Sequence, residues 1–184
     1  MPDKNLKRGP QIITPKDAAI ILAYSKTEPG SKVVDAGSGS GFLAMFLAKY
    51  LNPGKVYTYE KDERFVKLVK ENIKVSGLSN IILRKADVTN GIKEKNVDLI
   101  TLDLKDAVKV IGLAELSLKK GGVLFVYSPT VDHLFGAIKE IKKHKFRNIR
   151  IVESIVREWK SEHTLRPETK GIMHTGFLTF AKKF

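Results

Sequence analysis

The chain has 184 residues and a formal net charge of +13, and it contains no cysteine. This length suffices for one domain with a buried core, so we expect a single domain over residues 1–184. The lack of cysteine excludes disulfides and cysteine metal sites, and the four histidines share no metal-ligand spacing. Residues 1–9 are polar and partly basic, without an apolar segment, and no later apolar run reaches the length of a membrane span. We therefore expect a cytoplasmic protein with neither a metal nor a membrane partner.

Positive charge is concentrated toward the end of the chain. From residue 139 onward there are 12 lysines and arginines against 5 glutamates. Such an excess favours a polyanionic partner, nucleic acid before an anionic membrane, because no amphipathic segment with a broad aromatic face is visible. A lysine-rich solvated surface without a partner is the alternative.

The first predicted helix belongs to a lead-in segment. Thr14 can cap its N-terminus, Pro15 suits the first helical position, and Asp17 places an acid at the positive end of the helix dipole. We expect this helix to run to about residue 24, before a turn at residues 28–30. Residues 1–30 are therefore the lead-in, and residues 31–184 form the core of the domain.

A glycine-rich turn follows the first predicted strand. Residues 33–42 read VVDAGSGSGF, with Asp35 before three glycines at alternate positions. Glycine lets the backbone turn tightly and approach a ligand, and the apolar run over residues 43–48 predicts a helix whose free N–H groups face that ligand. The G-x-G-x-G spacing differs from the dinucleotide fingerprint and resembles the first motif of class I methyltransferases, whose donor is S-adenosylmethionine. A glycine turn without a ligand is the alternative.

An acid ends the next predicted strand, residues 55–60. Glu60 lies 19 residues beyond Gly41, the spacing at which an acid at the end of a second strand meets a pair of ribose hydroxyls. A carboxylate there accepts hydrogen bonds from both hydroxyls and repels a 2′-phosphate, which disfavours an NADP-type ligand. The alternative is an exposed acid at the head of the next helix, predicted over residues 62–76 and ended by Gly77.

Two further acids are predicted at the same edge of the sheet. Asp87 follows the strand over residues 81–83, although a surface turn acid is the alternative. Asp103 lies near the end of the clearest strand, residues 97–104, beside the first strand, where open α/β sheets place their ligands. Methyl transfer from a sulfonium moves positive charge onto the acceptor, and a fixed carboxylate stabilises that charge or takes a proton. The alternative for Asp103 is a cap on the helix from about residue 107.

The last third of the chain is predicted to contain a strand, a helix and an antiparallel pair. Tyr127 ends the strand over residues 123–127 and can offer a stacking face or a hydroxyl to a substrate base, unless it is simply a core residue. An amphipathic helix over residues 131–144 follows, and residues 147–159 and 171–183 are predicted as two long strands. The polar stretch between those strands is predicted as a hairpin loop. Alternating strands and helices indicate an α/β fold.

Motifs at both ends of the chain resemble the tRNA (adenine-N1)-methyltransferases that modify the T-loop adenine. Residues 7–19 read KRGPQIITPKDAA and are similar to the lead-in of that family. Residues 166–169, RPET, and residues 174–181, HTGFLTFA, are similar to its closing Arg-Pro-x-Thr and His-Thr-Gly segments. The resemblance implies a class I, Rossmann-like, seven-stranded and mostly parallel sheet with helices on both faces and an antiparallel C-terminal hairpin. It also implies S-adenosylmethionine as donor, tRNA as substrate and a homotetramer.

The same resemblance implies roles for individual residues. The acids would contact different parts of the donor, with Asp35 and the glycine loop at the methionine part, Glu60 at the ribose and Asp87 at the adenine. The full set expected to bind the donor is Gln11, Asp35, Gly37, Ser38, Gly39, Gly41, Glu60, Asp87 and Asp103. The catalytic residues would be Asp103, near the target base, and Tyr127. The residues expected beside the substrate or a subunit contact are Arg166, Thr169 and His174.

The chain departs from the family pattern in three places. Only six residues precede Lys7, so we expect the usual small N-terminal β-rich domain to be absent. Asp103 is followed by Leu-Lys-Asp-Ala in place of x-Pro-x-Pro, and residues 130–133 replace a polar run that ends in glutamine.

Three hypotheses remain open on the sequence. The chain is an RNA adenine-N1 methyltransferase, or a class I methyltransferase with another acceptor such as a corrin-type small molecule or a protein carboxylate. The third hypothesis is a non-catalytic chain that binds RNA and pairs with a separate catalytic chain.

Overall fold

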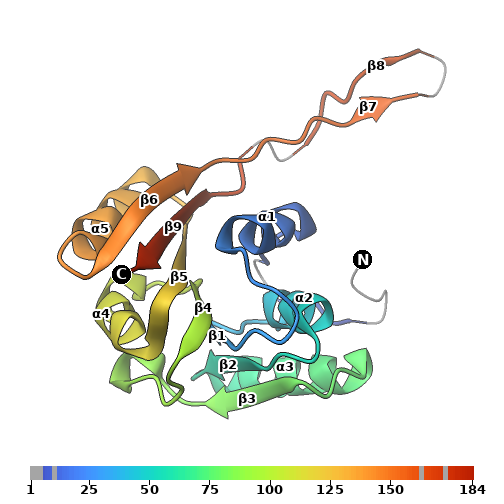
Figure 1. The fold of residues 1–184 in the computed structure, drawn as a ribbon. Helices are drawn as coiled ribbons and strands as arrows, with labels where there is room; N and C mark the ends of the chain where they lie inside the picture. The colour runs from blue at the N-terminus through green and yellow to red at the C-terminus, as the bar shows by residue number, and fades with distance from the viewer. Residues whose placement is uncertain (1–5, 10–11, 162–163, 172–173) are drawn as a thin grey trace.

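A seven-stranded sheet runs through the molecule in the computed structural model (Figure 1), which describes residues 6–9, 12–161, 164–171 and 174–184. Its strands are β1 Val33–Ala36, β2 Val56–Glu60, β3 Ile81–Lys85, β4 Val97–Leu102, β5 Leu118–Ser128, β6 Phe146–Val152 and β9 Phe177–Lys183. They lie in the order β3-β2-β1-β4-β5-β9-β6. Strands β1 to β5 are parallel neighbours, whereas β9 runs antiparallel to both β5 and β6. The predicted seven-stranded, mostly parallel sheet is confirmed.

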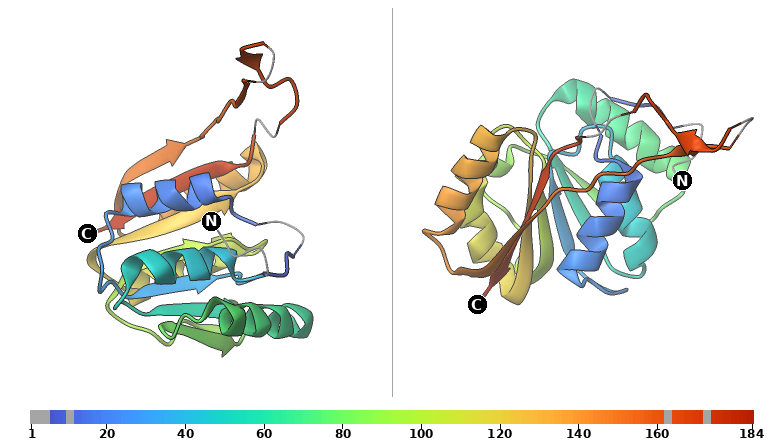
Figure 2. Two further views of the ribbon diagram at one scale, coloured as in Figure 1. Left: turned by 90° about the vertical axis from the view of Figure 1, so that its right-hand side faces the viewer. Right: turned by 90° about the horizontal axis from the view of Figure 1, so that it is seen from above.

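Helices cover both faces of this sheet, as Figure 2 shows. They are α1 Pro15–Ser25, α2 Phe42–Leu51, α3 Glu63–Ser76, α4 Ala107–Ser117 and α5 Val131–Ile141, with a 3-10 turn η1 at Val88–Asn90. Helices α1, α2 and α3 lie along one face, and α4 and α5 lie along the other. One core forms between the sheet and α1 and α2, and a second forms between the sheet and α4 and α5. Both faces of the central strands are buried, which explains why those strands are nearly continuous apolar runs.

The predicted helix ends agree with the structure. Thr14 caps α1, its hydroxyl accepting from the backbone N–H of Asp17 at 3.4 Å, and Pro15 is the first helical residue. Asp62 caps α3 in the same way, and α3 ends at Gly77, whose φ of +67° is left-handed. These ends are encoded by neighbouring residues, so local reasoning predicts them well. Helix α5 is three residues shorter than predicted because it ends at Ile141.

The prediction of two long C-terminal strands was wrong in its extent. Strand β6 ends at Val152 and β9 begins at Phe177, and between them the described residues 153–161, 164–171 and 174–176 form an arm that projects from the body (Figure 1). Within the arm, β7 Trp159–Lys160 pairs with β8 Arg166–Pro167 in a separate two-stranded sheet. Among the described residues of the arm, β7 and β8 pair with each other and not with the main sheet.

Candidate active site

The acids predicted from the sequence lie at one edge of the sheet. Strands β2, β1 and β4 are adjacent and parallel, so Glu60 at the end of β2 and Asp103 after β4 lie at their carboxyl ends. The backbone N–H of Asp103 donates to the Ala36 carbonyl at 2.9 Å, which extends the β1–β4 pairing to this residue. In an open α/β sheet this edge, where the strand order reverses, is the place where ligands bind.

Steric contact explains two of the three glycines in the loop between β1 and α2. A Cβ on Gly37 would collide with the carbonyl oxygen of Asp103, and one on Gly41 would lie 2.6 Å from a methyl of Val69 in α3. These two glycines are thus required by the chain's own packing. Gly39 has nothing within 4 Å of its Cβ position, and its φ of +53° turns the loop. The open side of the loop at Gly39 is where a bound molecule can approach the backbone.

Asp35 is fully enclosed by hydroxyl groups from the two flanking strands. The register sets Asp35 opposite Thr58 of β2 and Thr101 of β4, and each threonine hydroxyl donates to one carboxylate oxygen at 2.7 Å. The hydroxyls of Ser38 and Thr58 lie 2.5 Å apart, which joins the glycine loop to this network. Burial raises the pKa of Asp35 to about 6, and the charge of Glu60 adds to the rise against the hydrogen bonds from the threonines.

Glu60 ties the end of β2 to the glycine loop. Its Oε2 accepts from the backbone N–H of Gly39 at 3.0 Å. Its Oε1 accepts from the N–H groups of Lys61 and Asp62 at 2.9 and 3.0 Å. The carboxylate is half-buried beside Gly39. It is therefore fixed at the loop where the spacing predicts a ribose.

Asp87 lies beyond β3 and is held as a charged group. It caps η1, its Oδ1 accepting from the N–H and the hydroxyl of Thr89 at 3.0 and 2.7 Å, and its Oδ2 accepts from the Lys61 ammonium at 3.1 Å. These hydrogen bonds, those from Thr89 first, lower the pKa of Asp87 to about 2. Any ligand that donates to Asp87 shares it with Lys61.

Asp103 has the opposite electrostatic character. It is half-buried, and burial together with the charge of Asp35 raises the pKa of its carboxyl to about 7. No side chain caps α4, whose N-cap residue is Asp106, so the alternative of Asp103 as a helix cap does not apply. A carboxyl with this pKa exchanges a proton easily near neutral pH.

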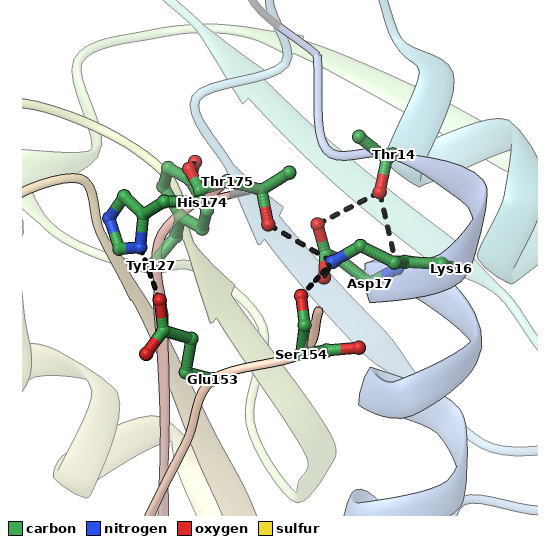
Figure 3. Close-up of polar contacts among 8 residues, drawn as sticks. All are labelled: Thr14, Lys16, Asp17, Tyr127, Glu153, Ser154, His174 and Thr175. Atoms are coloured by element: carbon green, nitrogen blue, oxygen red, sulfur yellow. Dashed lines mark hydrogen bonds and ion pairs between the residues drawn. The ribbon is translucent and has the colours of Figure 1, made fainter. Parts of the chain in front are cut away.

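The substrate-side residues do not all gather at one place. Tyr127 is buried near the end of β5, and its hydroxyl donates to the carbonyl of Thr175 at the base of the arm (Figure 3). His174 lies there too, with Nδ1 2.6 Å from a carboxylate oxygen of Glu153, a contact that raises its pKa. Arg166 is farther out, in β8, and Thr169 follows it along the arm. Gln11 lies outside the described residues.

Sequence reasoning missed the residues that support the acids. Thr58 and Thr101 are polar residues inside otherwise buried strands, and that was the available signal, but their partner is fixed only by strand register. Lys61 directly follows Glu60 and pairs with Asp87. Lys16, next to the cap of α1, donates to Asp17, Ser154 and Thr175.

The charge at this edge suits a cationic ligand. Besides burial, the charge of Glu60 disfavours ionisation of Asp35, and the charge of Asp35 disfavours ionisation of Asp103. The ionised carboxylates therefore repel one another at this edge. A bound cation relieves this repulsion, and S-adenosylmethionine carries both a sulfonium and an ammonium group. The open side of Gly39 and the fixed carboxylate of Glu60 fit the same molecule. Among the described residues, no group of three or more histidines or acids is placed to hold a metal ion.

Residues 3–164 match the family described as the tRNA methyltransferase complex GCD14 subunit. The chain belongs to this family. A curated relative, tRNA (adenine(57)-N(1)/adenine(58)-N(1))-methyltransferase TrmI of Methanocaldococcus jannaschii, is 34% identical over 97% of this chain and 74% of its own length. The predicted membership of the tRNA (adenine-N1)-methyltransferase family is thereby confirmed.

Two solved structures share the whole fold with this family member. A SAM-dependent O-methyltransferase from Thermotoga maritima superposes with a TM-score of 0.92 at 34% identity, covering 97% of this chain and 68% of its own. The tRNA (m1A58) methyltransferase TrmI from Aquifex aeolicus superposes with a TM-score of 0.90 at 26% identity, covering 98% of this chain and 73% of its own. The predicted class I methyltransferase fold is confirmed.

Proposed function

We propose that this chain is a S-adenosylmethionine-dependent methyltransferase that methylates N1 of an adenine in tRNA. Membership of the tRNA methyltransferase family supports the reaction and the substrate class. The observation that carries the assignment within the structure is Asp103, a carboxyl of nearly neutral pKa at the ligand-binding edge of the sheet. The curated relatives are named for adenine 58, and the one from Methanocaldococcus jannaschii also for adenine 57.

The chemistry of adenine N1 suits a carboxylate at this place. When bound, S-adenosylmethionine would supply the methyl group from its sulfonium, and the broken S–CH3 bond would leave its electron pair on sulfur as a neutral thioether. N1 attacks with its lone pair, and the methylated base is a cation until its exocyclic amine loses a proton. Asp103 in its ionised form stabilises that cation and accepts the proton. Tyr127, close to the end of the next strand, is proposed as the aromatic group beside the target base.

The remaining site assignments are part of the same proposal. Glu60 would bind the ribose hydroxyls, and Asp87, with Lys61 beside it, the adenine of the donor. The glycine loop with Asp35 and Ser38 would hold the methionine part, and because Asp35 is enclosed by threonine hydroxyls, its role is to fix the loop. Gln11 would close the donor pocket from the lead-in.

RNA binding and self-association complete the proposal. The excess of lysine and arginine beyond residue 139 supports RNA contact, with Arg166, Thr169 and His174 on the substrate side. Four large apolar side chains of the arm are exposed, namely Ile155, Val156, Trp159 and Leu165. Their exposure supports a homotetramer whose subunits contact one another through the arm. No helix in the described part of the chain is long and apolar enough to cross a membrane. A cytoplasmic location is part of the proposal because tRNA is the substrate.

The proposal is tested with labelled S-adenosylmethionine and unmodified tRNA, followed by nucleoside mass spectrometry against 1-methyladenosine. Wild type is expected to form 1-methyladenosine, and Asp103→Ala to form none even at donor concentrations that calorimetry shows to be saturating for that variant. Exposed Asp132→Ala, in the first turn of α5, is the control that keeps activity. Donor binding without any methylated nucleoside would overturn the RNA acceptor, and the lack of donor binding would favour a non-catalytic chain.

A different acceptor is the second candidate. The segment after Asp103 departs from the family pattern that the rest of the chain resembles because it contains no proline, and the Thermotoga maritima structure is named an O-methyltransferase. If tRNA is not methylated while the donor binds, the same labelled donor with small hydroxylated or corrin-type acceptors tests this candidate.

A further inference from the structure

The ammonium group of Lys16 joins three segments that are far apart in the sequence. It donates to the Asp17 carboxylate at 2.6 Å, to the carbonyl of Ser154 at 2.7 Å and to the hydroxyl of Thr175 at 3.1 Å (Figure 3). A lysine has three N–H donors, so each of them has an acceptor here. The side chain of Lys16 is 23% exposed and that of Asp17 only 1%, which makes this pair unlike the exposed ion pairs elsewhere on the molecule.

Helix α1 holds the acceptor side of this junction in place. Thr14 caps the helix, and its hydroxyl donates to the second oxygen of the Asp17 carboxylate at 2.8 Å. The carboxylate is thus oriented from two directions, and the ammonium that binds it is oriented too. A buried carboxylate needs such partners because its desolvation is costly.

The other two partners of Lys16 are the two ends of the arm. Ser154 lies on the outgoing segment just after β6, and Thr175 lies on the returning segment just before β9. A second contact, between His174 and Glu153, joins the same two segments beside the first. Lys16 therefore fastens the base of the arm, on both sides, to the start of α1.

Thr175 connects Lys16 to Tyr127, which lies near the end of β5. Its hydroxyl accepts from Lys16, and its carbonyl accepts from the hydroxyl of Tyr127 in β5. The next residue, Gly176, packs so closely on Tyr127 that a Cβ there would lie 2.5 Å from the ring. Displacement of Thr175 therefore changes the contacts of Tyr127, the aromatic group proposed beside the target base.

The junction also borders a groove. A cavity of about 420 Å³ lies between the start of α1 and the arm, lined by Thr14, Pro15 and Lys16 on one side and by residues 156–158, 168–171 and 175 on the other. The arm-side lining includes Thr169, already proposed on the substrate side, and two basic residues, Arg157 and Lys170, whose charges are balanced by Glu158 and Glu168.

We infer that Lys16 is a positioning residue for the RNA acceptor. It fixes the base of the arm and, through Thr175, it fixes Tyr127, the aromatic residue proposed beside the target base. This inference rests on the proposed function. Lys16 touches neither the reacting atoms nor the donor loop in this arrangement. Its loss should therefore act on the use of RNA and leave donor binding alone.

The test is a double-mutant cycle between Lys16→Met and Thr175→Val, read as kcat/KM for tRNA with donor affinity measured by calorimetry. We expect Lys16→Met to lower kcat/KM for tRNA at least tenfold and to change the donor Kd less than twofold. Thr175→Val, which removes only the hydroxyl, should lower kcat/KM three- to fivefold. The double variant should be no worse than Lys16→Met alone. Exposed Lys70→Met in α3 is the matched control.

Two additions keep the outcome clear. Lys16→Met combined with Asp17→Asn removes the orphaned buried charge, so that a loss caused only by misfolding would be reversed in this variant. Hydrogen exchange gives a readout without RNA, and it should rise at residues 153–160 and 174–176 in Lys16→Met but not in β1 or β4. Additive effects in the cycle, equal losses of donor binding, or unchanged exchange in the arm would each overturn the inference. A wild type that fails to methylate tRNA would overturn the proposed function, while hydrogen exchange would still decide whether Lys16 fastens the arm.

Discussion

Asp103 should couple donor binding to the release of a proton. Its pKa of about 7 reflects burial and the charge of Asp35, and a cationic donor favours the ionised carboxylate. If only the ionised form binds well, raising the pH from 6 to 8 should tighten the Kd for S-adenosylmethionine about tenfold, levelling off above the pKa. Calorimetry in buffers of different ionisation enthalpy would measure both the Kd and the proton release near pH 6.5.

The reaction product provides the control for this linkage. S-adenosylhomocysteine lacks the sulfonium charge, so its affinity should vary less with pH than that of the donor. Asp103→Asn should flatten the dependence for S-adenosylmethionine. A pH slope in Asp103→Asn equal to that of wild type would mean that another group carries the linkage.

Glu60 should matter for donor affinity before it matters for stability. Its carboxylate accepts from three backbone N–H groups, including that of Gly39, and Gln in its place presents an amide that cannot accept at both ends. We expect Glu60→Gln to weaken donor binding by about 10- to 100-fold, since hydrogen bonds to a charged group are lost. Glu63→Gln, an exposed acid at the start of α3, should keep the wild-type Kd. Equal donor affinity in wild type and Glu60→Gln would remove the ribose assignment.

At the level of the element, a substitution in the glycine loop can be compared with one at Gly30, outside the loop, to distinguish the cost of backbone strain from that of a steric collision. Gly30 and Gly37 have nearly the same φ, +93° and +91°, but only Gly37 has backbone atoms at its Cβ position. Gly30→Ala should therefore lose about 1 kcal/mol of unfolding free energy from strain, and Gly37→Ala several kcal/mol because the β4 end must move as well. Urea unfolding of both variants measures the difference. Similar losses would show that the loop at Gly37 yields without displacing Asp103.

Elements whose signals are local were predictable, and elements that depend on distant partners were not. The caps of α1 and α3 and the spacing from Gly41 to Glu60 lie within short stretches of sequence, and the structure has them where they were expected. Residues 147–159 and 171–183 were predicted as two long strands joined by a hairpin loop, whereas the strands of the main sheet are Phe146–Val152 and Phe177–Lys183. Whether such a segment stays in a sheet depends on a neighbour, and the local pattern does not contain that information.

The candidate site shows the same division. The acids at the strand ends follow from the alternation of strands and helices, because parallel strands bring their carboxyl ends to one edge. The enclosure of Asp35 by Thr58 and Thr101 follows from register, and the contacts of Lys16 with Ser154 and Thr175 follow from the course of the arm. None of these pairs is visible as a motif.

Across the whole molecule, the buried acids tie stability to pH. Burial raises the pKa of Asp35 to about 6 and that of Asp103 to about 7, above the ordinary value of about 4 that both have in the unfolded chain. Between those values the folded state binds more protons than the unfolded state. The two acids therefore leave the free energy of unfolding highest below pH 4, where they are protonated in both states. It falls as the pH rises through 7, because ionisation is more favourable in the unfolded chain than in the folded one.

We expect urea unfolding to show this decline between pH 5 and pH 8. Over that range the free energy of unfolding of Asp103→Asn should fall by about 1–2 kcal/mol less than that of wild type. Exposed Asp132→Asn should follow the wild-type curve. Parallel curves for wild type and Asp103→Asn would mean that the carboxyl is already ionised at pH 5 in the folded state. The cationic donor favours the ionised acids that destabilise the fold at high pH, so the rise in melting temperature caused by S-adenosylmethionine should be larger at pH 8 than at pH 6. The ionised acids thus lower the stability of the free chain at high pH and favour the binding of a cationic ligand.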